Sequence, residues 1–346
     1  MKNWFGSGAA ANVVSLILRL VYNFVIPLFG LALLTFLIGR LMPTDPVLAI
    51  VGDQASTETY RHVREGLGLD LPVLEQFWLY LTRLAHGELG RSVLTTRPVV
   101  EDILRAFPAT LELSIASIMI GIVGGVPLGV LAAVRKDRFS DHAIRVFTLV
   151  GYSVPSFWLG LMGLAILYGK LGWAAGPGRL DVAYEYLVEP ITGMTTVDAL
   201  LERQWDVFYD ALQHLVLPSL VIGYFSLALI CRMTRALMLS EMNQEYVITA
   251  KVKGLSANRI VWRHVFRNTM GSLSTVIALT FGLLLEGSVL TETVFSWPGL
   301  GSYMTNSLRN ADMNAILGGT LFIGAMFIVV NWIADLIQAS LDPRVG

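Results

Sequence analysis

The chain has 346 residues, of which 54% are hydrophobic and only 15% are charged, and its formal net charge is −1. So apolar a composition is rare in soluble domains and indicates a polytopic membrane protein. The near-neutral charge excludes a global basic field for nucleic acid. The single cysteine, Cys231, excludes an intrachain disulfide and a thiolate metal cluster, and is expected to be a packed apolar residue.

Six apolar stretches are long enough to cross a bilayer, which takes about 20 residues in a helix. We predict spans at Val13–Leu41, Thr110–Val134, Ile144–Gly169, Leu215–Ala236, Met270–Leu290 and Ile316–Leu341. The first stretch is too long for the apolar core of a signal peptide and lacks a small-residue cleavage site, so we expect it to be retained. The predicted fold is therefore an all-α integral membrane protein with about six transmembrane helices.

Charge in the connections predicts the orientation of these spans. The short Arg135–Asp141 turn and the Arg232–Arg267 segment are basic, whereas Asp181–Asp210 is acidic. Because basic loops stay in the cytoplasm, both termini are expected there. The predicted organisation is a cytoplasmic N-terminus (1–12), a first helix (13–41), an external region (42–109), a transmembrane core with five further helices (110–341) that includes a cytoplasmic segment (236–269), and a cytoplasmic tail (342–346).

Prolines and glycines interrupt the predicted spans. Pro155 is expected to kink the third span, since proline removes a backbone donor and clashes with the preceding turn. Gly121, Gly125 and Gly129 form a face of small residues on the second span, which permits close helix packing.

The segment Glu245–Asn268 is polar and basic although it lies between two long apolar runs. Gly254 is placed to end one short helix as a C′ glycine, and Ser256 is placed to cap a second. In the second helix three arginines, Arg259, Arg263 and Arg267, recur every four residues as one stripe, with Ile260, Val261, Val265 and Phe266 lying away from it. Two interpretations remain open: an amphipathic helix facing solvent or headgroups, and a helix seated in a groove of a soluble partner.

These residues resemble a known family. Thr249-Ala250, three further residues and Gly254 resemble the EAA loop of bacterial ABC-importer permeases, with Ile248 where the family pattern has Glu. Further motifs resemble the peptide branch of that family, and follow its order along the chain: Met42–Pro46, Gly66–Asp70, Gly87–Gly90, Ala109–Leu113, Gly151–Pro155, Leu290–Gly301 and Leu341–Arg344. The nearest resemblance is to the B-type permease subunit of the dipeptide, oligopeptide and nickel importers, and the length fits the dipeptide type best.

The resemblance implies the type I importer permease fold in the bacterial inner membrane, with residues 42–109 in the periplasm. It implies as partners a homologous second permease subunit, two cytoplasmic ATPase subunits and a periplasmic substrate-binding protein. By the same resemblance the residues that meet an ATPase are Glu245, Tyr246, Thr249, Ala250, Lys253, Gly254 and Leu255. The chain lacks the GxxxxGK[ST] phosphate loop, so we expect it to be non-catalytic and to bind no cofactor, with ATP and Mg used by the partner subunits.

A translocation path is expected around the third and fifth spans. Glu286 is the best candidate for an ionisable residue inside a span; such groups usually face a bundle interior or a watery cavity. It could meet the ammonium group of a peptide, or pair within the bundle, or be protonated. The other candidate path residues are Tyr152, Ser153, Pro155, Phe157 and Trp158, whose aromatic members could instead be interfacial packing.

The predicted function is import of di- and oligopeptides from periplasm to cytoplasm, driven by separate ATPase subunits through the 245–268 helices. Nickel chelate, glutathione or haem remain alternative substrates of the same importer class. An ion-coupled secondary transporter is a remote alternative, because it would need internal repeats and several buried carboxylates. An intramembrane enzyme or a structural scaffold is as remote, because such an enzyme would need a paired acid or a Ser/His pair inside the spans and none is evident. HExxH and GxSxG are also absent, and no metal site is predicted.

Overall fold

The computed structural model describes residues 21–41, 46–52, 55–66, 68–185 and 187–341. Within these ranges all regular elements are helical, and the isolated bridge between Arg91 and Pro98 is the one strand-like pairing. The prediction of an all-α protein is confirmed. The N-terminal part of the predicted first span, most of the Met42–Pro46 motif and the tail after Leu341 lie outside the described residues.

The chain divides into two compact units, the first formed by the described residues of 1–104 and 306–332. Its elements are η1 (Val21–Val25, π-helical), α2 (Ile26–Leu41), α3 (Pro46–Val51), α4 (Thr57–Gly66), α5 (Val73–Ala85), the first turns of α6, the end of α16 and most of α17. Helices α2 and α5 are joined by a 2.9 Å hydrogen bond between the hydroxyls of Thr35 and Tyr80 and by ring packing of Phe36 on Phe77. Buried Asp312, just before α17, accepts a 2.5 Å hydrogen bond from Ser92 and so fixes the segment that follows α5.

The second unit comprises residues 105–305 and the described residues after 332. Its elements are α6 (Val99–Ile120), η2 (Gly121–Gly125, π-helical), α7 (Val126–Val134), α8 (Phe139–Ser153), α9 (Ser156–Gly163), η3 (Leu164–Lys170, π-helical), η4 (Val182–Tyr184, a 3-10 turn), α10 (Thr195–Leu201), α11 (Trp205–Met242), α12 (Glu245–Val252), α13 (Ala257–Arg259), η5 (Ile260–Val265, π-helical), α14 (Phe266–Gly287), α15 (Val289–Val294), α16 (Leu300–Arg309) and the end of α17 (Met313–Leu341).

Helix α11 is the axis of this unit, because α7, α8, α14 and η2 all pack against it. The predicted small-residue face is confirmed where η2 and α7 meet α11. A Cβ on Gly125 would lie 2.8 Å from the backbone oxygen of Leu227, and a Cβ on Gly129 would lie 2.6 Å from that of Cys231. The two backbones approach too closely for any side chain at either glycine.

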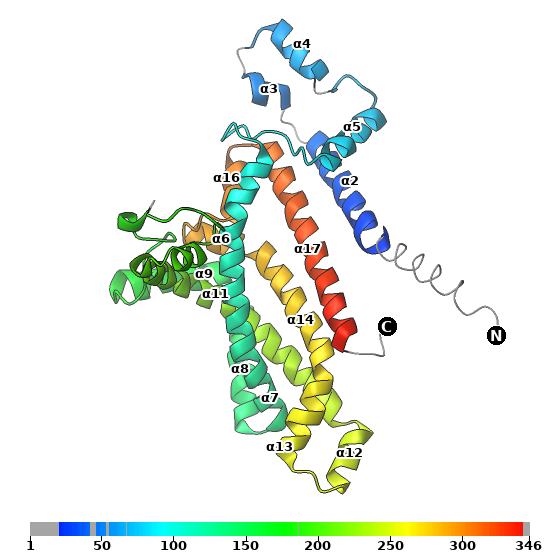
Figure 1. Cartoon of the computed structure of the whole chain (residues 1–346), viewed down its shortest axis with the longest axis vertical. Coiled ribbons are helices and arrows are strands. Elements are labelled where there is room, and N and C mark those ends of the chain that lie inside the picture. Colours follow the sequence, from blue (N-terminus) through cyan, green and yellow to red (C-terminus); the bar gives the residue numbers. More distant parts are fainter. Residues whose placement is uncertain (1–20, 42–45, 53–54, 67, 186, 342–346) are drawn as a thin grey trace, which may run out of the picture. The chain divides into compact units, whose positions relative to one another are not determined.

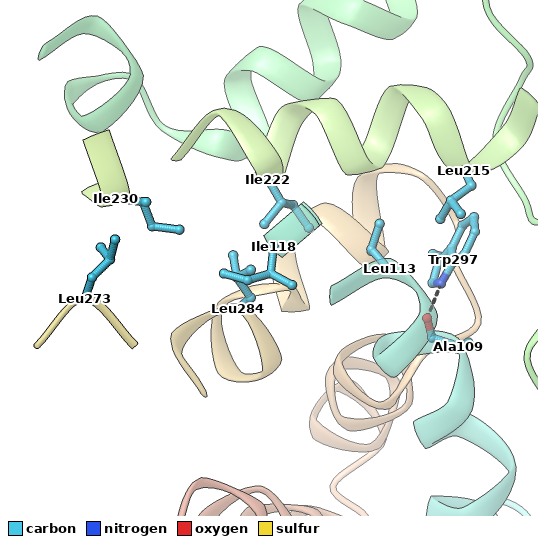
Figure 2. Close-up of a cluster of buried hydrophobic side chains, with 9 residues drawn as sticks. All are labelled: Ala109, Leu113, Ile118, Leu215, Ile222, Ile230, Leu273, Leu284 and Trp297. Atoms are coloured by element: carbon cyan, nitrogen blue, oxygen red, sulfur yellow. Dashed lines mark hydrogen bonds between the residues drawn. The ribbon is translucent and has the colours of Figure 1, made fainter. Parts of the chain in front are cut away.

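A buried apolar cluster joins α6, α11 and α14, and Figure 2 shows its members pointing toward one another: Ala109, Leu113, Ile118, Leu215, Ile222, Ile230, Leu273, Leu284 and Trp297. The indole of Trp297 donates a 2.9 Å hydrogen bond to the backbone oxygen of Ala109. Because the indole N–H finds this partner, a large aromatic ring can be buried without leaving a polar atom unsatisfied.

Among the residues that the structure describes, four helices are long and apolar enough to cross a membrane: Val99–Val134, Trp205–Met242, Ala257–Gly287 and Met313–Gln338. They correspond to the second, fourth, fifth and sixth predicted spans. The second begins at Val99, not at Thr110. Its first turn is polar, so hydropathy alone does not identify this part of α6 as helix. In the described part of the first predicted span, the apolar helix is the shorter Ile26–Leu41.

The third predicted span, Ile144–Gly169, is not one continuous helix. It is two helices, Phe139–Ser153 and Ser156–Lys170, bent by 94° at their junction. Pro155 begins the second piece and holds Val154 in extended backbone, with φ −85° and ψ 126°, because the residue before a proline is disfavoured in the helical region. The predicted kink is confirmed and is sharp enough to break the span.

Candidate functional site

The predicted helix pair in the 236–269 segment is present. Helix α12 ends at Val252, Gly254 adopts a φ of +75°, and the chain turns into α13 and η5. A positive φ is costly for any residue with a Cβ, so the turn requires glycine. Figure 1 shows α12 and α13 at one tip of the second unit, near the turn between α7 and α8.

The expected cap of the second helix is only partly correct. Ser256 occupies the N-cap position with extended backbone, but its side chain makes no capping hydrogen bond. Its backbone oxygen instead accepts the N–H of Ile260 at 3.0 Å, which starts the helix without help from the hydroxyl.

The inner face of this helix pair is anchored to the unit. Val247 and Ala250 of α12 and Ile260 and Val265 of η5 are buried in one apolar cluster, and Val130, Ala133 and Met238 of the longer helices complete it. The hydroxyl of Tyr246 donates a 2.7 Å hydrogen bond to Glu241. Burial is the main cause that raises the pKa of Tyr246 to about 12, and this hydrogen bond to Glu241 is the second cause. Helix α12 is therefore held to the ends of α7 and α11 by both apolar and polar contacts.

The outer face of α12 is open. Ile248 is 59% exposed and Val252 is 83% exposed, and Glu245, Thr249 and Lys253 are also exposed beside them. Of the seven predicted ATPase-contact residues, Glu245, Thr249, Lys253 and Gly254 lie on the exposed surface, whereas Ala250 is buried and Tyr246 and Leu255 are half-buried. The predicted arginine stripe (Arg259, Arg263 and Arg267) is exposed on the next helix, with Ile260 and Val265 turned inward.

A cavity of about 650 Å³, which we name the outer cavity, lies between the break in the third span, the middle of α11 and the C-terminal end of α14. It brings together three of the predicted path residues, Tyr152, Pro155 and Glu286. The other three, Ser153, Phe157 and Trp158, do not line it and are exposed on α8 and α9. Among the described residues Glu286 has no hydrogen bond or ion pair and is the one charged side chain in the cavity wall, which disfavours the alternative that it pairs within the bundle.

The more deeply buried carboxylate is Glu292, which the sequence analysis missed although it lies inside the Leu290–Gly301 motif. It is 0% exposed. Its oxygens accept hydrogen bonds from the hydroxyls of Thr110 at 2.7 Å and Ser288 at 2.8 Å and from the backbone N–H of Ser302 at 3.0 Å. The hydroxyl of Thr110 in turn accepts the N–H of Leu300 at 2.8 Å. This network ties α15 and α16 to α6.

A second buried carboxylate, Glu112, organises the acidic connection between the third and fourth spans. It pairs with Arg179 and accepts a 2.8 Å hydrogen bond from the N–H of Thr196. Arg179 also lies over the ring of Trp297, 5.5 Å from its centroid. The Ala109–Leu113 and Leu290–Gly301 motifs thus meet through Glu112, Arg179 and Trp297.

A third carboxylate, Asp141, joins α8 to α11. It is 0% exposed, and Arg235 donates to both of its oxygens at 2.7 Å. A bidentate ion pair of this kind requires a specific geometry of the two side chains. In the sequence, Arg235 served only as a marker of orientation, and nothing there indicated Asp141 as its partner.

The family described as "Binding-protein-dependent transport system inner membrane component" matches residues 125–346, and its N-terminal companion family matches residues 13–114. A protein named probable D,D-dipeptide transport system permease of Escherichia coli is 39% identical over 96% of this chain and 97% of its own length. A di/tripeptide transport system permease of Pseudomonas aeruginosa is 40% identical over 92% and 94%, and a dipeptide transport system permease of E. coli is 39% identical over 93% and 96%.

Among solved structures, a chain of the MetNI methionine ABC transporter in an inward-facing conformation superposes with a TM-score of 0.51 and 16% identity, covering 70% of this chain and 97% of its own. This likeness confirms the importer-permease fold. Together with the matched families and the full-length relatives, it shows that the chain belongs to the family of inner membrane components of binding-protein-dependent transport systems.

Proposed function

We propose that this chain is the permease subunit of an ATP-driven importer that moves dipeptides and short oligopeptides from periplasm to cytoplasm. The names of the full-length relatives support this substrate class. The cavity bounded by Tyr152, Pro155 and Glu286 supports a path through the unit, since a lone carboxylate in an otherwise uncharged wall suits the ammonium group of a peptide. Glutathione, nickel chelates and haem are the competing cargoes.

The observation that carries the proposal is the exposed outer face of a firmly anchored α12. Ile248 and Val252 are apolar side chains open at the surface, on a helix whose opposite side is buried against α7 and α11. A rigid knob of this kind can transmit the closure of a partner as a rigid-body movement. The partners proposed are two cytoplasmic ATPase subunits, a homologous second permease subunit and a periplasmic binding protein.

The proposed orientation places α12, α13 and both termini in the cytoplasm and residues 42–109 in the periplasm. The basic Arg135–Asp141 turn lies at the same tip as α12, and two basic connections at one end agree with the positive-inside rule. ATP and Mg are used by the ATPase subunits, so this chain performs no covalent chemistry and holds no cofactor.

The test is a matched pair of proline variants. Gly254 has φ +75° and Gly172 has φ +62°, and a Cβ at either would meet no atom within 4 Å. Proline fixes φ near −65°, so Gly254→Pro and Gly172→Pro impose the same local strain, one in the coupling turn and one after η3. In the assembled transporter, Gly254→Pro is expected to abolish dipeptide uptake and peptide-stimulated ATPase activity, and Gly172→Pro to retain both. Normal uptake by Gly254→Pro would contradict the coupling role.

The cargo is tested in the same reconstituted system by competition. An excess of unlabelled dipeptide is expected to suppress uptake of labelled dipeptide, whereas nickel chelate, glutathione and haem are expected to leave it unchanged. Uptake that persists without ATP but stops when the ion gradient is collapsed would favour a secondary transporter.

A further inference from the structure

A second cavity, which we name the inner cavity, lies between α8 and α11 on the side of the Arg135–Asp141 turn. Its volume is about 420 Å³, and its wall includes His142, Arg145, Leu149, Tyr152 and Arg232. Tyr152 also lines the outer cavity. The two cavities therefore adjoin at one tyrosine side chain.

The two cavities carry opposite charge. In the inner cavity, Arg235 is neutralised by Asp141. Arg145 and Arg232 are exposed, and among the described residues no carboxylate lies within ion-pair distance of either. Arg145 lies within electrostatic range of Asp141, but that carboxylate is already paired with Arg235. Two guanidinium groups without an ion-pair partner among the described residues thus face the inner cavity, whereas Glu286 is the one acidic side chain in the wall of the outer cavity.

Tyr152 is held at the boundary from both sides. Its ring stacks on Phe225 with centroids 5.8 Å apart and 18° between the planes, and the guanidinium of Arg232 lies 4.9 Å from its centroid. Phe225 lines the outer cavity and Arg232 the inner one. A guanidinium over an aromatic face is attracted by the ring but keeps its N–H groups free for an anion.

We propose that the two cavities are successive stations on one peptide path: Glu286 receives the ammonium group of the peptide in the outer cavity, and Arg232 with Arg145 receives its carboxylate in the inner cavity. This inference rests on the proposed peptide transport and adds the residues that would select a zwitterionic cargo. Tyr152 separates the two cavities, and the peptide passes this side chain on its way from the outer cavity to the inner one.

The spacing along α11 agrees with successive occupation. Ile222 lines the outer cavity and Arg232 the inner one, and ten residues of helix rise about 15 Å. An extended dipeptide spans only about 7 Å, which is shorter than this rise and agrees with occupation of one station at a time. The arginines then attract the free carboxylate inward after the ammonium group leaves Glu286.

The charge of each station can be measured with single cysteines in the assembled transporter, on a background in which buried Cys231 is replaced by alanine. Leu149 lines the inner cavity and is 64% exposed, and Leu290 lines the outer cavity and is 56% exposed. Rates of modification by an anionic and a cationic methanethiosulfonate are compared at Leu149→Cys and Leu290→Cys. The ratio of anionic to cationic rate is expected to be at least tenfold higher at position 149.

Variants that each remove one charge test whether the named residues cause the difference in the anionic-to-cationic rate ratio. Arg232→Gln is expected to lower the ratio at position 149 by roughly three- to fivefold, the effect of one nearby charge in a watery site, and to leave position 290 unchanged. Glu286→Gln is expected to raise the ratio at position 290 and leave position 149 unchanged. Equal ratios at the two positions, or a ratio at position 149 that Arg232→Gln leaves unchanged, would overturn the proposal.

Substrate protection identifies the occupant. A dipeptide with a free carboxylate is expected to slow labelling at position 149 during turnover, and its C-terminal amide to protect at least fivefold less, after both are matched for saturation of the binding protein. Loss of the anionic preference on adding anionic lipid, with no protection by peptide, would instead assign the inner cavity to a lipid headgroup. Because the labelling ratios need no transport, they stay measurable if dipeptide uptake fails, and the two hypotheses fail separately.

Discussion

The buried carboxylate of Glu292 should be far less replaceable than that of Glu286, although six residues separate them. In Glu292→Gln one oxygen can still accept from Thr110 and Ser288, but the new amide group faces the N–H of Ser302, which the carboxylate accepts at 3.0 Å. The variant loses one hydrogen bond to a charged acceptor, and its amide N–H groups face the N–H of Ser302, donor against donor. Together these changes lower the free energy of unfolding by about 3 kcal/mol. Glu286→Gln removes no hydrogen bond and should change stability by less than about 0.5 kcal/mol.

The assay is thermal unfolding of the purified assembled transporter carrying either variant. Glu292→Gln is expected to lower the midpoint by several degrees, and Glu286→Gln to leave it within error. Glycines pack closely around this carboxylate: a Cβ added to Gly299 would overlap both of its oxygens, and one added to Gly301 would lie 3.0 Å from one of them. The amide has no room to turn away, so equal midpoints for the two variants would refute the assignment of Glu292 as the centre of a structural network.

Two further predictions follow from the packing on α11. Arg235→Ala should lower stability by about 3–5 kcal/mol, because it leaves the buried carboxylate of Asp141 without its counterion; thermal unfolding should show partial recovery in the double variant Asp141→Asn/Arg235→Gln, and no recovery would contradict the pairing. Gly129→Val should prevent accumulation of folded protein in the membrane, because its side chain would enter the backbone of α11 beside Cys231, whereas Gly30→Val, at a glycine with no neighbour within 4 Å, should accumulate normally.

Hydropathy was a good guide to this fold where a span is apolar from end to end. Helices α11, α14 and α17 were all predicted, and Pro218 lies inside α11 without breaking it. The start of α6 was predicted too late in the chain, because Glu101 and Asp102 in its first turn are typical of a loop. Charged residues near a helix N-terminus are favourable, so polarity there does not mark the end of a helix.

The site was predictable in part. Gly254 was identified because a helix stop followed by a new helix needs a residue that tolerates positive φ, and the structure has it at +75°. The roles of Glu286 and Glu292 could not be ranked from the sequence. Both follow apolar runs, and only the contact of Glu292 with Thr110, 182 positions earlier in the chain, shows which one is enclosed. The inner cavity was missed because its arginines were interpreted only as signals of orientation.

The π-helical turn at Gly121–Gly125 sets the rotational phase of everything that follows it in this span. Such a turn holds one residue more than the α-helical ladder would, and one residue corresponds to about 100° of rotation about the axis. If the same sequence were wound as a continuous α-helix, α7 would stay helical and apolar, but Gly129 would swing away from α11 by about that angle and a bulkier neighbour would take its place. The close contact of Gly129 with α11 therefore depends on this turn as well as on the glycine itself, although the hydropathy of the segment gives no sign of it.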